Sequence, residues 1–108
     1  MPTAISVEPV IEPRVREVLR RHNAEAAFQT ACDIARSCFL AMGTLRVDVL
    51  DDPDEENRVW VVLHIQVPAS YRWETLHEEE LRFHKAMLTQ IPLDLNPLFG
   101  LHMDYSPD

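Results

Sequence analysis

Two histidines and a glutamate in the second half of the chain have side chains suited to metal binding or acid–base chemistry. They are His77, Glu80 and His84. Imidazole nitrogens and carboxylate oxygens are ligands that Zn²⁺ and Fe²⁺ accept in proteins. On a helix, however, His77 and His84 would lie about 10 Å apart along the axis, too far for both to bind one ion. The sequence therefore predicts at most a site made of Glu80 with one histidine, completed by another element.

A helix is predicted to carry these three residues. Thr75 and Glu78 form a capping box that opens it, with a start one turn earlier at Ser70 as the alternative, and it lasts until Pro92. One arc of about 140° is predicted to face the protein, and it contains Leu76, His77, Glu80, Leu81, His84, Met87, Leu88 and Ile91. The opposite side is predicted to be exposed to solvent, and it contains Glu78, Glu79, Arg82, Lys85, Ala86 and Thr89. A carboxylate within an apolar stripe is costly unless paired. Glu80 therefore either has a partner or lies where the first turn leaves the protein edge.

A second group of polar residues is predicted on one face of a sheet. In residues 58–67 the side with alternate residues from Val59 to Val67 is aliphatic, and the other side is mixed. If the strand over 99–106 lies beside this one, the mixed face collects the candidate partner-binding residues Arg46, Asp48, Arg58, Trp60, Val62, His64, His102 and Asp104. Two histidines and an aspartate can bind an ion or move protons. A flat surface centred on a tryptophan is more typical of a protein contact. An open sheet face, its tryptophan partly shielded by arginines, is the alternative.

The apolar pattern predicts the elements that position these groups. In chain order they are helices over residues 13–22 and 24–42, strands over 44–50 and 58–67, a helix over 75–91 and a strand over 99–106. Asn23 is expected to cap the second helix and Gly43 to end it in the left-handed conformation, with one kinked helix as the alternative. The last strand lies either parallel to the second strand or antiparallel beside the first.

The predicted fold class is therefore α+β. We expect a two-layer sandwich in which helices cover one face of a small three-stranded mixed sheet, in the order α-α-β-β-α-β. Residues 1–12 are predicted to be an extended lead-in, and residues 13–108 a single domain.

Charge and composition exclude several classes of function. The 108 residues include 10 Lys and Arg against 18 Asp and Glu, a net charge of −8, which disfavours nucleic acid as a partner. We expect the arginines of the first helix to form a solvated face paired with nearby glutamates; they are Arg14, Arg16, Arg20 and Arg21. The longest apolar run is far shorter than the roughly 20 residues of a membrane span. No secretory signal is recognisable, so we expect a cytoplasmic protein without a membrane partner.

Several cofactor and catalytic motifs are also missing from the sequence. Its two glycines, Gly43 and Gly100, do not suffice for a phosphate-binding loop or a dinucleotide fingerprint, so no cofactor is expected. The acidic segment 51–57 lacks the central glycine of a calcium loop and is predicted to be a hairpin loop. Cys32 and Cys38 point different ways on one predicted helix, so we expect reduced thiols.

These observations favour a small acidic, non-catalytic accessory protein that acts by binding proteins. Small domains often gain stability by pairing, so we expect a homodimer. The acidic charge also suits a basic protein partner. The rival hypothesis is a metal-dependent hydrolase that uses Glu80 with His84 or His77.

Overall fold

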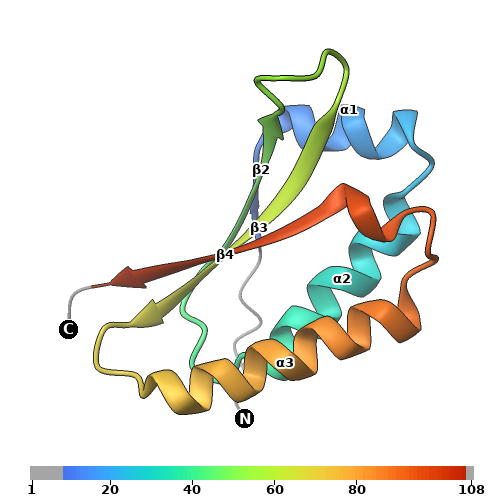
Figure 1. Cartoon of the computed structure of the whole chain (residues 1–108). Helices are drawn as coiled ribbons and strands as arrows, with labels where there is room; N and C mark the ends of the chain where they lie inside the picture. The colour runs from blue at the N-terminus through green and yellow to red at the C-terminus, as the bar shows by residue number, and fades with distance from the viewer. Residues whose placement is uncertain (1–8, 107–108) are drawn as a thin grey trace, which may run out of the picture.

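The computed structural model describes residues 9–106 and places three helices on one side of a twisted sheet (Figure 1). Its elements, in chain order, are β1 (Val10–Ile11), α1 (Pro13–Arg21), α2 (Glu25–Cys38), β2 (Leu45–Asp51), β3 (Val59–Pro68), α3 (Trp73–Gln90), the 3-10 helix η1 (Asn96–Leu98) and β4 (Phe99–Ser106). The predicted α+β class is confirmed. Among these helices, none has both the length and the apolar character needed to cross a membrane.

The sheet has four strands in the order β1-β2-β3-β4, where three were predicted. Strands β2 and β3 form the predicted antiparallel hairpin, and β4 lies parallel to β3. The additional strand, β1, is only two residues long and pairs parallel to β2. It lies within the predicted lead-in, of which residues 1–8 are outside the described residues. A two-residue strand shows no alternation, so the hydrophobic pattern could not reveal it.

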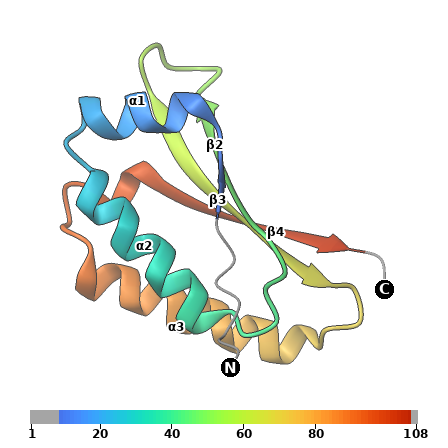
Figure 2. The ribbon, with the colours of Figure 1, turned by 180° about the vertical axis from the view of Figure 1, so that it is seen from behind.

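The core lies between the helices and the aliphatic side of β3. Val61, Leu63, Ile65 and Val67 are all at most 1% exposed, which confirms the predicted two-sidedness of this strand. Figure 2 shows the three helices on the same side of the sheet, with α2 and α3 packed against each other. Burying each of these side chains contributes about 1.5–3 kcal/mol. The sheet therefore has one face fixed by packing and one face turned away from the helices.

The N-terminal helical region is broken into two helices, as predicted, but its caps differ from those expected. Asn23 adopts a left-handed conformation with φ 53°, and Ala24 is the N-cap of α2. Helix α2 ends at Cys38, five residues before Gly43, which has no positive φ and instead donates its N–H to the Gln66 carbonyl. The helix ends early because the next residue, Phe39, turns into the core, where it is 1% exposed.

Helix α3 begins at Trp73, two residues before the predicted capping box, and neither Thr75 nor Ser70 is its N-cap. Its predicted buried arc is confirmed for Leu76, Met87 and Ile91 but is wrong for Leu81, Leu88 and the two histidines, which are exposed. The residues that α3 buries are Leu76, Glu79, Phe83 and Met87, whereas Leu81 and Leu88 are 57% and 62% exposed. The ring of Phe83 packs on that of Phe39, the residue that follows α2, with centroids 5.5 Å apart. This aromatic contact rotates the helix away from the arc that the leucines suggest.

An ion pair fixes α1 to the end of β2. Arg14 of α1 donates two hydrogen bonds of 2.9 Å to the carboxylate of Asp51 at the end of β2, and this contact lowers the pKa of Asp51.

Cys32 and Cys38 are free thiols, as predicted. Burial raises the pKa of Cys32 to about 11, so this thiol stays protonated and unreactive at neutral pH.

Candidate functional site

The sheet face opposite the helices carries alternate residues of β2, β3 and β4, and we call it the open face. Its residues are Arg46, Asp48 and Leu50 from β2, Trp60, Val62 and His64 from β3, and Gly100, His102 and Asp104 from β4. Of the two predicted positions for the last strand, the structure has the one beside β3, with His102 opposite His64. Arg58, which precedes β3, lies over the Trp60 ring. The structure thus brings together the residues predicted on the mixed face.

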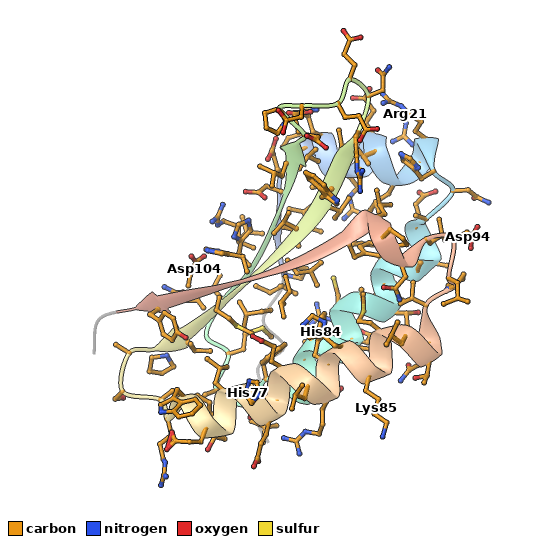
Figure 3. The ribbon with its side chains drawn as sticks, viewed as in Figure 1. Arg21, His77, His84, Lys85, Asp94 and Asp104 are labelled. Carbon is orange, nitrogen blue, oxygen red and sulfur yellow. The ribbon has the colours of Figure 1, made fainter. Side chains whose placement is uncertain are left out.

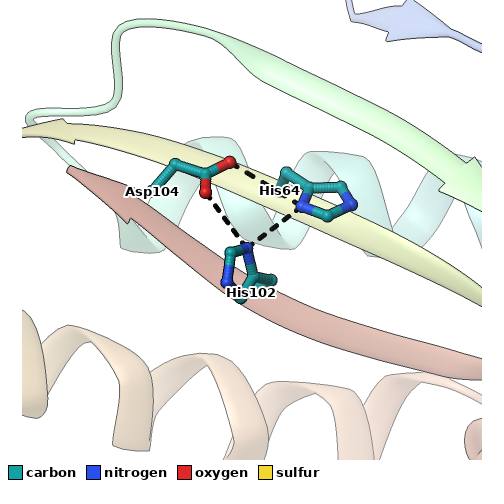
Figure 4. Close-up of side chains that lie close together, drawn as sticks. All are labelled: His64, His102 and Asp104. Atoms are coloured by element: carbon teal, nitrogen blue, oxygen red, sulfur yellow. Dashed lines mark hydrogen bonds and ion pairs between the residues drawn. The ribbon is translucent and has the colours of Figure 1, made fainter. Parts of the chain in front are cut away.

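One half of the open face is a connected polar cluster, and Figure 4 shows three of its members, His64, His102 and Asp104. Arg46 Nη1 donates to Asp48 Oδ2 at 3.0 Å, and His64 Nε2 lies 2.8 Å from Asp48 Oδ1. The other ring nitrogen, His64 Nδ1, lies 3.1 Å from His102 Nδ1. His102 Nδ1 is in turn 3.2 Å from Asp104 Oδ1. Five side chains from three strands therefore form one chain of polar contacts.

The carboxylate of Asp48 determines which nitrogen of His64 carries hydrogen. An ionised carboxylate only accepts, so His64 Nε2 must donate to Asp48. In neutral imidazole the other nitrogen is then an acceptor, and His64 Nδ1 directs its lone pair toward His102 and Asp104. The His64 side chain is 14% exposed, against 58% for His102 and 40% for Asp104. The cluster therefore has a fixed inner imidazole and an accessible outer side.

Next to this cluster lies a mostly apolar hollow of about 620 Å³, and Asp48, His64 and His102 of the cluster form part of its lining. Its lining includes Leu50, Trp60 and Val62, and its floor is exposed because Gly100 has no side chain. A Cβ at Gly100 would meet Val62 at 3.6 Å, an ordinary contact, so the space is real and can be filled. Trp60 is half-buried, and the Arg58 guanidinium lies 5.3 Å from its ring centroid. This half offers an apolar pocket beside an accessible indole.

The other predicted site residues do not meet in space. Along α3, His77 and His84 are exposed and Glu80 is half-buried; Figure 3 shows both histidines across β4 from Asp104. Within residues 9–106, the one group of three or more His, Cys, Asp or Glu with ligand atoms within 4.8 Å of one another is His64, His102 and Asp104. Among the described residues, potential metal ligands therefore come together on the strands. The three predicted residues of α3 are not part of such a group.

The buried carboxylate on α3 is Glu79, which sequence reasoning placed on the wet side. Glu79 is 1% exposed, and Tyr71 donates a hydrogen bond of 2.8 Å to its Oε2. This bond, together with burial, raises the pKa of Tyr71. Within the described residues Oε1 has no hydrogen-bond partner. The sequence signal for this burial was the position of Glu79 three residues after Leu76 and four before Phe83, on the same helical face.

Comparisons of the chain with protein-family models, with curated proteins and with solved structures find no match. What the open face can do is therefore inferred from its own side chains.

Proposed function

We propose that this protein is a non-catalytic binding protein that self-associates through its open face. The observation that carries the proposal is the apolar hollow over Gly100, which lies beside the half-buried Trp60 on the sheet face turned away from the helices. Tryptophan and arginine are enriched at the energetic centres of protein interfaces. A second copy would place apolar side chains in this hollow. The hollow and those side chains would then both be removed from water.

The charges around the hollow suit a second copy of the same chain. Both signs occur there, with Arg46 and Arg58 among the cations and Asp48 and Asp104 among the anions. In a two-fold interface each surface meets its own copy, so a surface with both signs offers its charges partners of opposite sign. A surface of one sign would repel itself. Self-association is therefore the form of binding that this face supports best.

The size of the face sets the expected strength of the dimer. Three strands spaced about 4.8 Å apart form a patch about 15 Å wide and about 25 Å long. This is below the roughly 800 Å² that each partner buries in a standard interface. We therefore expect a reversible dimer with a dissociation constant in the micromolar range, whose population rises with concentration.

Sedimentation velocity on the untagged chain, from about 1 µM to about 1 mM, tests the proposal. Trp60→Arg and Leu50→Arg should each keep the protein monomeric over this range, because each places a charge in the apolar half. Leu88→Arg is the matched control, since Leu88 is also an exposed leucine but lies on the outer side of α3. Circular dichroism confirms that each variant is folded.

The outcomes distinguish a dimer formed through the open face from a monomer and from a dimer formed through α3. Wild type that dimerises, Leu88→Arg that still dimerises and open-face variants that do not would support the proposal. A chain that is monomeric at every concentration contradicts it. Loss of the dimer in Leu88→Arg alone would assign the interface to α3.

A further inference from the structure

We infer that His64, His102 and Asp104 bind a divalent transition-metal ion of the zinc class on the open face. This site adjoins the apolar hollow, whose lining includes His64 and His102, and it is inferred from its own ligands and not from self-association. Two imidazole nitrogens and a carboxylate are a donor set that suits Zn²⁺ and its neighbours and disfavours Ca²⁺ and Mg²⁺, which take oxygen ligands.

The distances among the three ligands match the edges of a metal coordination shell. At Zn–N bonds of 2.0–2.1 Å, two ligands of a tetrahedral ion lie about 3.3 Å apart. The two Nδ1 atoms of His64 and His102 are 3.1 Å apart, and His102 Nδ1 is 3.2 Å from Asp104 Oδ1. The other oxygen of the same carboxylate, Asp104 Oδ2, lies 3.7 Å from His64 Nδ1. One ligand atom from each of the three residues lies within 4.8 Å of the others, so small side-chain shifts would place all three around one ion.

The sheet holds these ligands in place before any ion arrives. His64 and His102 are register partners on adjacent parallel strands. Asp104 lies two residues after His102, so the pleat directs both side chains to the same face. Ligands fixed on neighbouring strands lose little conformational freedom on binding, and rigid elements position a site better than loops do.

Asp48 and Arg46, behind His64, give this inner ligand the correct tautomer. Asp48 accepts the Nε2 hydrogen of His64, which leaves Nδ1 free to coordinate, and Arg46 holds Asp48 from the other side. A carboxylate on the far nitrogen of a histidine is the usual outer partner at zinc sites. On binding, His102 transfers its hydrogen from Nδ1 to Nε2, so both imidazoles coordinate as neutral ligands through Nδ1.

Two features set the expected affinity and access. His102 and Asp104 are 58% and 40% exposed, so the positions that the protein does not fill would be open to water. The Arg46 guanidinium lies 3.7 Å from Asp104 Oδ2, and its charge opposes the arriving cation. We therefore expect an exchangeable site of micromolar affinity and not a permanently occupied structural site.

Isothermal titration of the untagged chain with zinc chloride tests the inference, with Co²⁺ absorption as a spectroscopic check. We expect one ion per chain, with no comparable binding of Ca²⁺ or Mg²⁺. His102→Ala should weaken Zn²⁺ binding at least about 100-fold, more than the 10–100-fold typical of an outer-shell partner. His102 is exposed on an edge strand, so this variant should fold even if His64→Ala does not.

Two further variants make the test specific. His84→Ala is the matched control, because it removes an exposed histidine from α3 and should leave the affinity unchanged. Asp48→Asn keeps the size of the outer partner but removes its charge, and should weaken binding about 10-fold or more without changing the stoichiometry. No Zn²⁺ binding, or binding that is unchanged in His102→Ala, would overturn the inference. Trp60→Arg should still bind Zn²⁺. The zinc titration therefore tests the metal site even if the protein does not self-associate.

Discussion

The histidine pair on the strands and the histidine pair on α3 differ in how the backbone spaces them. His64 and His102 are far apart in sequence but occupy the same register on adjacent strands, with their Nδ1 atoms 3.1 Å apart. His77 and His84 are close in sequence, yet a helix separates them by about 10 Å. Proximity in sequence therefore does not bring side chains together on a helix, whereas strand register pairs residues that are remote in sequence.

The two regions also differ in what surrounds each histidine. His64 is half-buried and bonded to the Asp48 carboxylate. His84 is exposed, and its ring lies edge-on to the ring of the neighbouring Phe83. A ligand needs a fixed orientation and a fixed tautomer. His64 has both, whereas the helix pair lies on the exposed surface of α3.

The largest expected effect tests that rotation directly. Phe83→Ala removes a buried ring from α3 and should destabilise the protein by about 3–5 kcal/mol. Leu81→Ala, two residues away on the exposed side, should change the free energy of unfolding by less than about 0.5 kcal/mol. Urea unfolding of both variants measures the difference. Equal destabilisation by the two substitutions would contradict the assignment of Phe83 to the buried side of α3 and of Leu81 to the exposed side.

The second prediction contrasts the histidine pairs through stability. An ion that binds only the folded state stabilises it by about 2.7 kcal/mol at 100 times its dissociation constant. Saturating Zn²⁺ should therefore raise the free energy of unfolding by roughly this amount in the wild type and in His84→Ala. At the same Zn²⁺ concentration the gain should fall to about 0.4 kcal/mol or less in His102→Ala, whose affinity is at least about 100-fold lower. Urea titrations with Zn²⁺ and with a chelator measure it, and a gain that depends on His84 would reverse the comparison.

The sequence predicted the secondary-structure pattern because most elements carry a long periodic signal. The alternation from Val59 to Val67 identified β3 and both of its faces, and the position of β4 beside β3 was one of two stated alternatives. The gathering of His64, His102 and Asp104 followed from that alternative. Their mutual distances could not be predicted, because they depend on register, and register is set by packing across the sheet.

The errors arose where one tertiary contact outweighed a local pattern. Leu81 and Leu88 suggested a buried face on α3, but packing of Phe83 on Phe39 set the rotation and placed Glu79 inside. Gly43 suggested the end of α2, yet burial of Phe39 ended the helix earlier. Such contacts join residues that are remote in sequence, so helical periodicity alone does not contain them.

The third prediction concerns the buried carboxylate that replaces Glu80 as the inward acid of α3. Tyr71→Phe removes the hydrogen bond to Glu79 and leaves a buried carboxylate unsatisfied, which should cost about 1–3 kcal/mol. Adding Glu79→Leu should recover much of this loss, because both polar partners are then gone. Glu80→Gln is the matched control and should have little effect. Urea unfolding measures all three, and destabilisation by Glu80→Gln comparable to that by Tyr71→Phe would contradict the assignment.

The smallest expected effect is the dependence of stability on alkaline pH. The hydrogen bond to Glu79 and burial raise the pKa of Tyr71, while the nearby Arg82 charge opposes the shift. A raised pKa means that the folded state holds the phenol proton more tightly than the unfolded chain. This stabilisation is present in full below the ordinary tyrosine pKa of about 10 and is lost as the pH rises through the folded-state value.

The difference between wild type and Tyr71→Phe isolates this contribution, because the other alkaline groups are common to both proteins. Urea unfolding from about pH 8 to about pH 11 should show that the advantage of the wild type shrinks as the pH rises. The ionised phenol can no longer donate to Glu79, so the two carry like charges within a hydrogen bond's length of each other. An advantage that stays constant across this range would mean that Tyr71 stabilises α3 by packing and not through its proton.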